Sequence, residues 1–212
     1  MARTVDPKRH AEKRQHILHH AAVLFATYGY DPTSTAQICK AAGISPGNLY
    51  HYFSSKKAIF IAIVSDEDPD DNESTQSALA RCLADADPLD GVVTFVQHLA
   101  SAAAASPIVP QLVIEAMLLA RHDQEIADLL AQDSNVEQHG LQQLLARARS
   151  AGAIDAAIDP ADAAAWLQAL IGAIYLEAAH NPTFDPSRQL ANLTRTVRGF
   201  LTEPGSRKAF TD

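Results

Sequence analysis

Residues 33–60 read TSTAQICKAAGISPGNLYHYFSSKKAIF, and this stretch predicts three short helices joined by tight turns. Apolar residues recur at helical spacing up to Gly43, which stands where a helix C-cap favours a residue that tolerates positive φ. Ser45 is then a good N-cap, and Pro46 follows at the first helical position, where its missing N–H costs nothing. A second helix is therefore expected from Pro46 to about Phe53.

Two helices joined by a turn of three or four residues form a helix-turn-helix, whose second helix usually enters the DNA major groove. At about 100° per residue, Leu49 and Phe53 share one face of that helix, and this face must be the buried one. The opposite face carries small, amide and imidazole side chains that suit base edges, with phenols that suit phosphates. The residues expected on this outward surface are Gly47, Asn48 and His51, flanked by Tyr50 and Tyr52.

The residues on either side of these two helices suggest contacts to phosphates. Lys56 and Lys57 open the third helix, where the helix dipole disfavours cations unless an anion lies nearby. A DNA phosphate would be such an anion, so we expect a phosphate contact from Lys56. Ser34 and Gln37 fit a capping box at the start of the first helix, and Thr33 is an equally good N-cap.

The run AAGISPGNLYHYFSSKKAIF resembles the DNA-binding signature of the TetR family of bacterial transcription regulators, over roughly residues 8–64. Phe25, Gly29 and Tyr30 also stand where that family's pattern expects them. Many relatives carry Lys where this chain has Pro46, so one basic contact is absent at that position. The resemblance implies that the hydroxyls of Thr33 and Ser34, where the helix before the turn begins, face a phosphate. The DNA-binding residues expected are Thr33, Ser34, Ser45, Gly47, Asn48, Tyr50, His51, Tyr52 and Lys56.

The net charge of −8 is divided unevenly along the chain. Residues 1–60 hold 8 Lys and Arg against 3 Asp and Glu, whereas residues 61–212 hold 9 against 22. A basic head can neutralise phosphates while an acidic body is repelled by DNA, which orients the molecule as it approaches. Solubility alone would explain the acidic body but not the basic head.

The remaining chain predicts an all-α fold: an N-terminal helix-turn-helix domain (residues 1–60) and a larger helical effector-binding and dimerisation domain (residues 61–212). The acidic run DEDPDDNE at residues 66–73 is read as a solvated linker rather than a calcium loop, because the sixth position lacks glycine and the twelfth lacks glutamate. We expect helices at residues 8–28, 73–84, 88–104, 107–121, 123–151 (with a break at Gly140 left open), 160–180 and 186–201.

Other functions find little support in the sequence. No hydrolase, nucleotide-binding or metalloprotease motif is present, so we expect no enzyme and no cofactor. His16, His19 and His20 are read as solvated or phosphate-facing rather than as metal ligands, because no second ligand pair accompanies them. Cys39 and Cys82 give no disulfide framework. The absence of a bilayer-length apolar run and of a signal peptide predicts a cytoplasmic protein without membrane contact.

The last two helices carry more large apolar residues than one core stripe needs, which predicts a homodimer, as in the TetR family. A dimer would bind a palindromic operator on double-stranded DNA. The resemblance also implies a cavity in the body for a small apolar or aromatic effector. The ligand-binding residues expected are Phe95, His98, Leu99, Leu112, Glu115, Met117, Trp166, Leu170 and Tyr175, with His122 and Glu177 as further polar candidates.

The sequence thus favours a ligand-responsive transcriptional regulator, most simply a repressor that its effector releases from DNA. Two other classes stay open. One is an effector-independent DNA-binding protein of the same fold that organises chromosome structure, and the other is a helical enzyme, for which no acid and base pair is evident. Binding to many genomic sites without a response to small molecules would indicate the chromosome-organising protein. Turnover of a candidate effector would indicate the enzyme.

Overall fold

The computed structural model describes residues 7–65 and 74–202, and every regular element within these ranges is a helix. This confirms the all-α class. The expected starts at Pro88, Pro160 and Pro186 are confirmed, with Asp87 and Asp159 capping the first two through their carboxylates. The helices are α1 Pro7–Tyr28, α2 Thr35–Ala42, α3 Pro46–Tyr52, α4 Lys56–Ser65, α5 Thr75–Leu83, α6 Pro88–Ala105, α7 Val109–Ala120, α8 Gln124–Ser150, α9 Pro160–His180 and α10 Pro186–Thr202.

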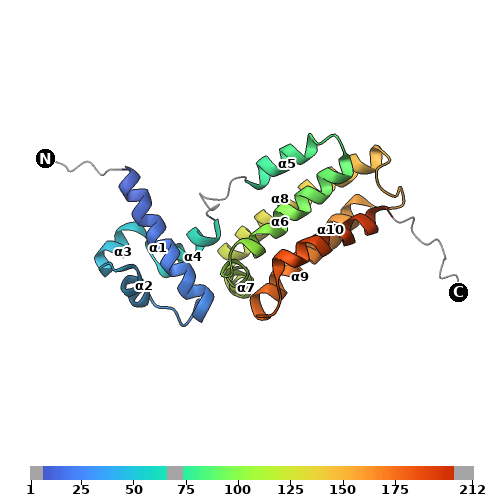
Figure 1. Cartoon of the computed structure of the whole chain (residues 1–212). Helices are drawn as coiled ribbons and strands as arrows, with labels where there is room; N and C mark the ends of the chain where they lie inside the picture. The colour runs from blue at the N-terminus through green and yellow to red at the C-terminus, as the bar shows by residue number, and fades with distance from the viewer. Residues whose placement is uncertain (1–6, 66–73, 203–212) are drawn as a thin grey trace. The chain divides into compact units, whose positions relative to one another are not determined.

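The chain divides into two compact units by its internal contacts. The first contains Met1–Asp70 together with Ile108–Leu130, and the second contains Asp71–Pro107 together with Ala131–Asp212. The first unit therefore includes α7 and the start of α8 in addition to α1–α4 (Figure 1). The expected linker at residues 66–73, with the calcium loop weighed against it, lies outside the described residues.

The first unit is organised around α1, which packs against α2, α4 and α7. Phe25 of α1 and Phe60 of α4 are almost completely buried, and their rings meet edge to face at a centroid distance of 5.3 Å. Ile38 of α2 and Leu49 of α3 fill the same core. Leu112 of α7 also belongs to this core, so α1–α4 share it with a helix that lies far along the chain.

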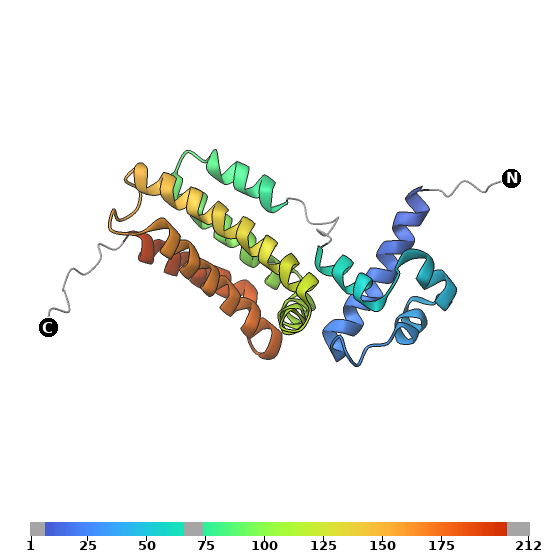
Figure 2. The same ribbon diagram turned by 180° about the vertical axis from the view of Figure 1, so that it is seen from behind.

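The second unit is organised around α6, which packs against α5, α9 and α10. Opposite views show α6 and α8 between α5 on one side and the α9–α10 pair on the other (Figures 1 and 2). Phe95 is fully buried at the centre of this unit. Leu144 and Leu145 of α8 and Leu167 of α9 are equally inaccessible to solvent, so these three helices contribute to one core.

Helix α8 continues through Gly140, where the sequence left a break open. A Cβ atom on Gly140 would lie 3.1 Å from the Phe95 ring and 3.2 Å from a methyl group of Leu79. The glycine therefore allows close packing against α5 and α6 without ending the helix. Gly140 is thus needed for steric reasons. The sequence pattern of α8 could not show this, because Phe95 and Leu79 lie on other helices.

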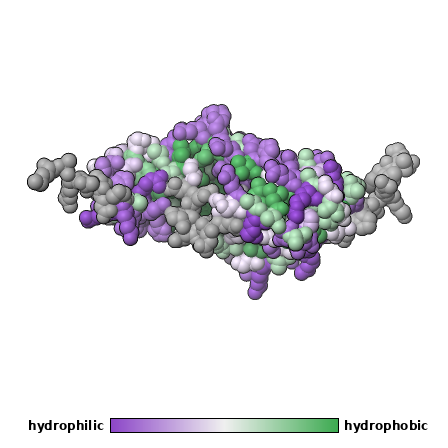
Figure 3. Space-filling view, turned by 90° about the horizontal axis from the view of Figure 1, so that it is seen from above, coloured by the Kyte–Doolittle hydropathy of each residue, from purple (hydrophilic) through white to green (hydrophobic). Residues whose placement is uncertain are grey.

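Among the described residues, no single helix is long and apolar enough to cross a membrane, although the consecutive helices α6 and α7 pass that test of length and composition when they are taken together. The space-filling view in Figure 3 shows hydrophobic residues in small groups among hydrophilic ones on the face it presents.

The close contact between α5 and α6 gives a test of the second core. A Cβ atom on Gly91 would lie 2.5 Å from the Cys82 carbonyl oxygen, so Gly91→Ala must shift one helix backbone. We expect a loss of about 1–3 kcal/mol in the free energy of unfolding, measured by urea denaturation. Gly47→Ala is the control, because open space surrounds that position in α3 and alanine favours helix. Equal stability of Gly91→Ala and the wild type would contradict this packing.

Candidate nucleic-acid interface

The turn between α2 and α3 has the geometry that the sequence predicts. Gly43 adopts the left-handed conformation, with φ 63°, and ends α2. The Ile44 N–H then donates to the Cys39 carbonyl at 3.0 Å, closing the turn. Ser45 caps α3 by accepting a hydrogen bond from the Asn48 N–H at 3.2 Å, and Pro46 occupies the first helical position. These local bonds fix the direction in which α3 leaves α2.

The two faces of α3 are separated as expected. Leu49 is 1% exposed and Phe53, which follows the helix, is 5% exposed, so both belong to the core. The opposite side is open: Gly47, Tyr50 and His51 are exposed, and Asn48 and Tyr52 are half-buried. The helix therefore presents a backbone free of Cβ at Gly47, an amide, an imidazole and two phenols to its surroundings. These groups can donate to and accept from base edges and phosphates.

The two hydroxyls at the start of α2 differ in their surroundings. Ser34 is the N-cap: its Oγ accepts from the Gln37 N–H at 3.3 Å, and the Gln37 side chain accepts from the Ser34 N–H at 2.7 Å. Thr33 is 1% exposed, and its hydroxyl donates to the Gly29 carbonyl at 2.8 Å. The Thr33 hydroxyl thus supports the preceding turn and is not open to a phosphate as expected, whereas Ser34 is exposed.

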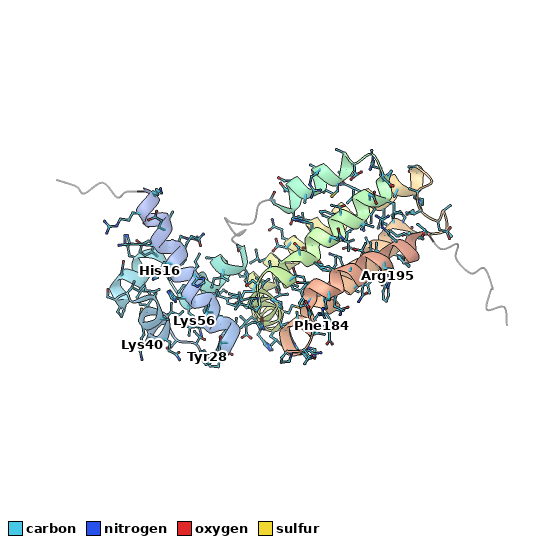
Figure 4. All side chains as sticks on the ribbon, in the orientation of Figure 1. His16, Tyr28, Lys40, Lys56, Phe184 and Arg195 are labelled. Atoms are coloured by element: carbon cyan, nitrogen blue, oxygen red, sulfur yellow. The ribbon has the colours of Figure 1, made fainter. Side chains whose placement is uncertain are left out.

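Lys56 contacts the turn after α1 from the start of α4. Its Nζ donates to the Tyr30 carbonyl at 2.8 Å and lies 4.0 Å from the centroid of the Tyr30 ring. The carbonyl and the ring both offset the unfavourable position of this cation at a helix start. Figure 4 shows Lys56 among the helices of the first unit, together with His16 and Lys40. The same Nζ also donates to the Asp31 carbonyl at 3.4 Å, and the expected contact of Lys56 with a phosphate stays a prediction.

Lys57 is held by carboxylates rather than left for a phosphate. Its Nζ lies 2.7 Å from an oxygen of Asp123 and 2.8 Å from an oxygen of Glu125, both at the start of α8. Hydrogen bonds to Asp123 and then Glu125 raise the pKa of Lys57, and the bond from Lys57 lowers the pKa of Asp123. This pair fastens α4 to α8 within the first unit.

A second long-range contact reaches the turn after α1. The Glu115 carboxylate of α7 accepts a hydrogen bond from the Tyr30 N–H at 2.6 Å. It also fits closely against Gly29, where a Cβ atom would lie 3.4 Å away and where φ is 87°. Burial, followed by repulsion from Asp123 and Asp31, raises the pKa of the Tyr30 phenol. Sequence spacing did not suggest either of these contacts, because their partners lie far apart in the chain.

The histidines of α1 are close to one another but form no evident metal site. His16 and His20 have ring centroids 4.6 Å apart, and the His16 Nε2 lies 3.0 Å from the Ala42 carbonyl oxygen at the end of α2. Burial, followed by repulsion from His16 and His19, lowers the pKa of His20. In the part of the chain that the structure describes, no three His, Cys, Asp or Glu side chains converge as a metal site would require.

The residues expected to bind a ligand fall in both units. In the first, Leu112 is buried, Glu115 is bonded to Tyr30, and Met117 is 53% exposed. In the second, the Phe95 and His98 rings stack at 6.3 Å, and the Tyr175 hydroxyl donates to the Leu99 carbonyl at 3.0 Å. Leu170 packs against that core, whereas Trp166 is 52% exposed. The structure thus brings together the members on α6 and α9.

The short turn, the capped second helix and its open polar face define a helix-turn-helix DNA-binding unit joined to a helical body. Comparison with known proteins agrees. Residues 17–63 match the model of bacterial regulatory proteins of the tetR family, and residues 88–202 match the C-terminal model of BetI-type transcriptional repressors. The second match alone covers more than half of the chain. The chain belongs to the TetR family, which consists of transcriptional regulators and not of enzymes.

Individual relatives support the same assignment. The Escherichia coli K12 regulator UidR is 37% identical over 79 residues, which are 37% of this chain and 35% of UidR. The match thus spans about a third of that relative. The structure of MbdR from Azoarcus sp. CIB has a TM-score of 0.75 at 20% identity, covering 89% of this chain and 98% of MbdR. FadR from Bacillus subtilis in complex with stearoyl-CoA has a TM-score of 0.66 at 16% identity, covering 86% and 96%.

The ion pair between Lys57 and Asp123 predicts a pH dependence. Because folding lowers the pKa of Asp123 below its usual 3.8, the pair stabilises the fold above that pH, and this stabilisation is lost as the pH falls through the lowered pKa. Asp123→Asn removes the charge but keeps an N-cap for α8.

The wild type should therefore be more stable than Asp123→Asn at pH 7, and the difference should shrink well below pH 3.8, as followed by urea denaturation across that range. Lys57→Gln should show the same trend, because it removes the other partner. A difference that stays constant with pH would mean that the ion pair does not contribute.

Proposed function

We propose that this protein is a repressor that binds a palindromic operator through α3 and is released by a small apolar or aromatic effector. The observation that carries the DNA-binding part is the open face of α3, where Gly47, Asn48 and His51 stand opposite the buried Leu49. Ser34, Ser45, Tyr50, Tyr52 and Lys56 complete the proposed interface with phosphate contacts. The basic balance of residues 1–60 supports the same surface.

The proposed operator is a palindrome because we propose a dimer. Buried Leu167, Ile171 and Ile174 use one side of α9, while Trp166 and Leu176 are 52% and 51% exposed on another side. Ala165, Ala169, Gly172 and Ala173 lie between them on the exposed surface, which would let a partner helix approach closely. An apolar helix face of this kind is favourable when a second copy of the chain covers it.

This dimer predicts the effect of a charge on that face. Trp166→Glu and Leu176→Glu should convert the dimer to a monomer, because each would place an unpaired carboxylate within the interface. Light scattering at micromolar concentration measures the mass. Ala80→Glu on the exposed side of α5 is the control and should stay dimeric. A wild-type protein that is monomeric yet binds its operator fully would contradict the proposal.

The proposed interface predicts two kinds of DNA-binding variant. Asn48→Ala and His51→Ala should change which bases are preferred, each by about 1–3 kcal/mol at the position it reads. Lys56→Ala should weaken binding to all sequences and reduce the slope of log affinity against log salt by about one. Selection from random DNA followed by titration at several salt concentrations measures both effects.

Thermal unfolding of Lys56→Ala belongs in the same experiment, because this lysine also contacts Tyr30. The assignment of the outward face would be wrong if Lys56→Ala altered the preferred sequence while Asn48→Ala left it unchanged.

Release by an effector is supported by the contacts at Tyr30. Glu115 of α7 and Lys56 of α4 hold the N–H and the carbonyl of the same residue, in the turn that follows α1. A ligand that displaces α7 would therefore move a backbone segment that positions α4 and the helices before it. Such coupling needs only a difference in affinity for the two states, of about 1–3 kcal/mol.

An apolar effector is consistent with the body. Phe95, Leu99 and Tyr175 contribute to an apolar core in which His98 stacks on Phe95. In FadR from Bacillus subtilis, the same fold is in complex with stearoyl-CoA, which has a long apolar chain. Pockets for such compounds are mostly apolar with a few polar groups.

The effector proposal predicts that some apolar or aromatic compounds raise the Tm of the protein and weaken its binding to the operator. At a concentration 100 times its Kd, a compound should stabilise the protein by about 2.7 kcal/mol. A library of such compounds, screened by thermal shift and then by operator binding, tests both effects. If every stabilising compound leaves operator affinity unchanged, the effector-independent chromosome-organising protein becomes the better interpretation.

A further inference from the structure

One side of α1 changes its chemistry toward the start of the helix. Ile17, Ala21 and Phe25 are buried along the side that packs on the core of the first unit. At 100° per residue, His10 and Arg14 lie on the same side, nearer the start of the helix. Toward the start of α1, the side of the helix that carries these buried apolar residues therefore continues with an imidazole and a guanidinium. Both residues are half-buried.

These two side chains contact the end of α3. The His10 ring lies 4.6 Å from the Tyr52 ring and 6.1 Å from the His51 ring, between centroids. The His51 and Tyr52 rings are themselves 5.3 Å apart. One turn further along α1, the Arg14 guanidinium lies 5.4 Å from the centroid of the Phe53 ring. His10, His51 and Tyr52 therefore form one cluster of three rings, which joins α1 to α3.

We infer that His10 is a positioning residue of the DNA interface, which holds His51 and Tyr52 in the orientation in which they meet DNA. This inference rests on the proposed function, since it assumes that those two residues contact the operator. His51 and Tyr52 occupy the last positions of a helix of only seven residues, and the His51 side chain is exposed. Without a neighbouring ring, such side chains sample several rotamers and lose that freedom on binding.

The contacts of His10 are made by the face and edge of its ring, so an aromatic ring should be able to replace it. Aromatic pairs in these arrangements stabilise one orientation over others. The role therefore differs from that of a lysine or arginine at a phosphate, which would add affinity for every sequence equally. This difference separates positioning from a simple electrostatic contact.

Three variants test the inference: His10→Ala removes the ring, His10→Phe keeps a ring, and His19→Ala is the matched control. His19 is an exposed histidine of the same helix, nine residues on and therefore on the opposite side. The probes are the duplex that the wild-type protein selects from random DNA and a scrambled duplex of the same length, both at one salt concentration. Thermal unfolding of each variant is followed in parallel.

We expect His10→Ala to weaken binding to the selected duplex by about three- to tenfold, the range that an aromatic pair accounts for, and to weaken binding to scrambled DNA less, because only the phosphate contact of Tyr52 is affected there. His10→Phe should restore most of this loss, and His19→Ala should bind both duplexes as the wild type does. Equal weakening on both duplexes, unchanged binding by His10→Ala, or no recovery in His10→Phe would each overturn the inference. A wild-type protein that selects no sequence at all would instead contradict the proposed function.

Discussion

The DNA-binding unit depends on the packing of Tyr30, the residue at which the chain turns after α1. Its ring packs against those of both Phe25 and Phe60, with centroid distances of 5.6 and 5.3 Å. Its N–H is bonded to Glu115 and its carbonyl to Lys56. One residue therefore joins α1, α4 and α7 through its ring and both of its backbone groups. The orientation of α3 follows from this, because α2 and α3 are built on the core that these helices form.

Backbone groups that are withdrawn from water, as at the half-buried Tyr30, are costly unless they are paired. The Tyr30 N–H is paired with the Glu115 side chain, and the Tyr30 carbonyl accepts from Lys56 and also from the Thr33 N–H at 3.2 Å. Glu115 is 85 residues away in the sequence, yet it satisfies a donor that the turn leaves without a helical partner. The same side chain was expected to bind a ligand. Its observed bond gives it a place in the contact between α7 and the DNA-binding helices.

Local features of the fold could be predicted from the sequence, because they depend on neighbours in the chain. Gly43, Ser45 and Pro46 define the turn before α3, and the spacing of Leu49 and Phe53 gives its buried face. The long-range contacts could not be predicted in this way. The pairing of Lys57 with Asp123 depends on how the helices pack. Helical spacing predicts which residues share a face, but not which helix packs against that face.

For the same reason, helical spacing can place a residue at a site without predicting which groups surround it. Thr33 has a suitable type for a phosphate contact, but the turn at Gly29 uses its hydroxyl. The contact of the His10 ring with Tyr52 of α3 was not expected, because His10 precedes the helix-turn-helix by more than twenty residues. A signal was present in the regular spacing of His10, Arg14 and Ile17 on one side of α1.

Methylation interference on the selected operator tests most directly whether α3 reads DNA through its open face. Guanine N7 lies in the major groove and adenine N3 in the minor groove, so the two methylated positions distinguish the grooves. A recognition helix in the major groove predicts that N7 methylation blocks binding at two clusters, about one helical turn or somewhat more apart, and that Asn48→Ala removes part of this pattern. Interference confined to adenine N3, or a pattern identical in the wild type and Asn48→Ala, would contradict it.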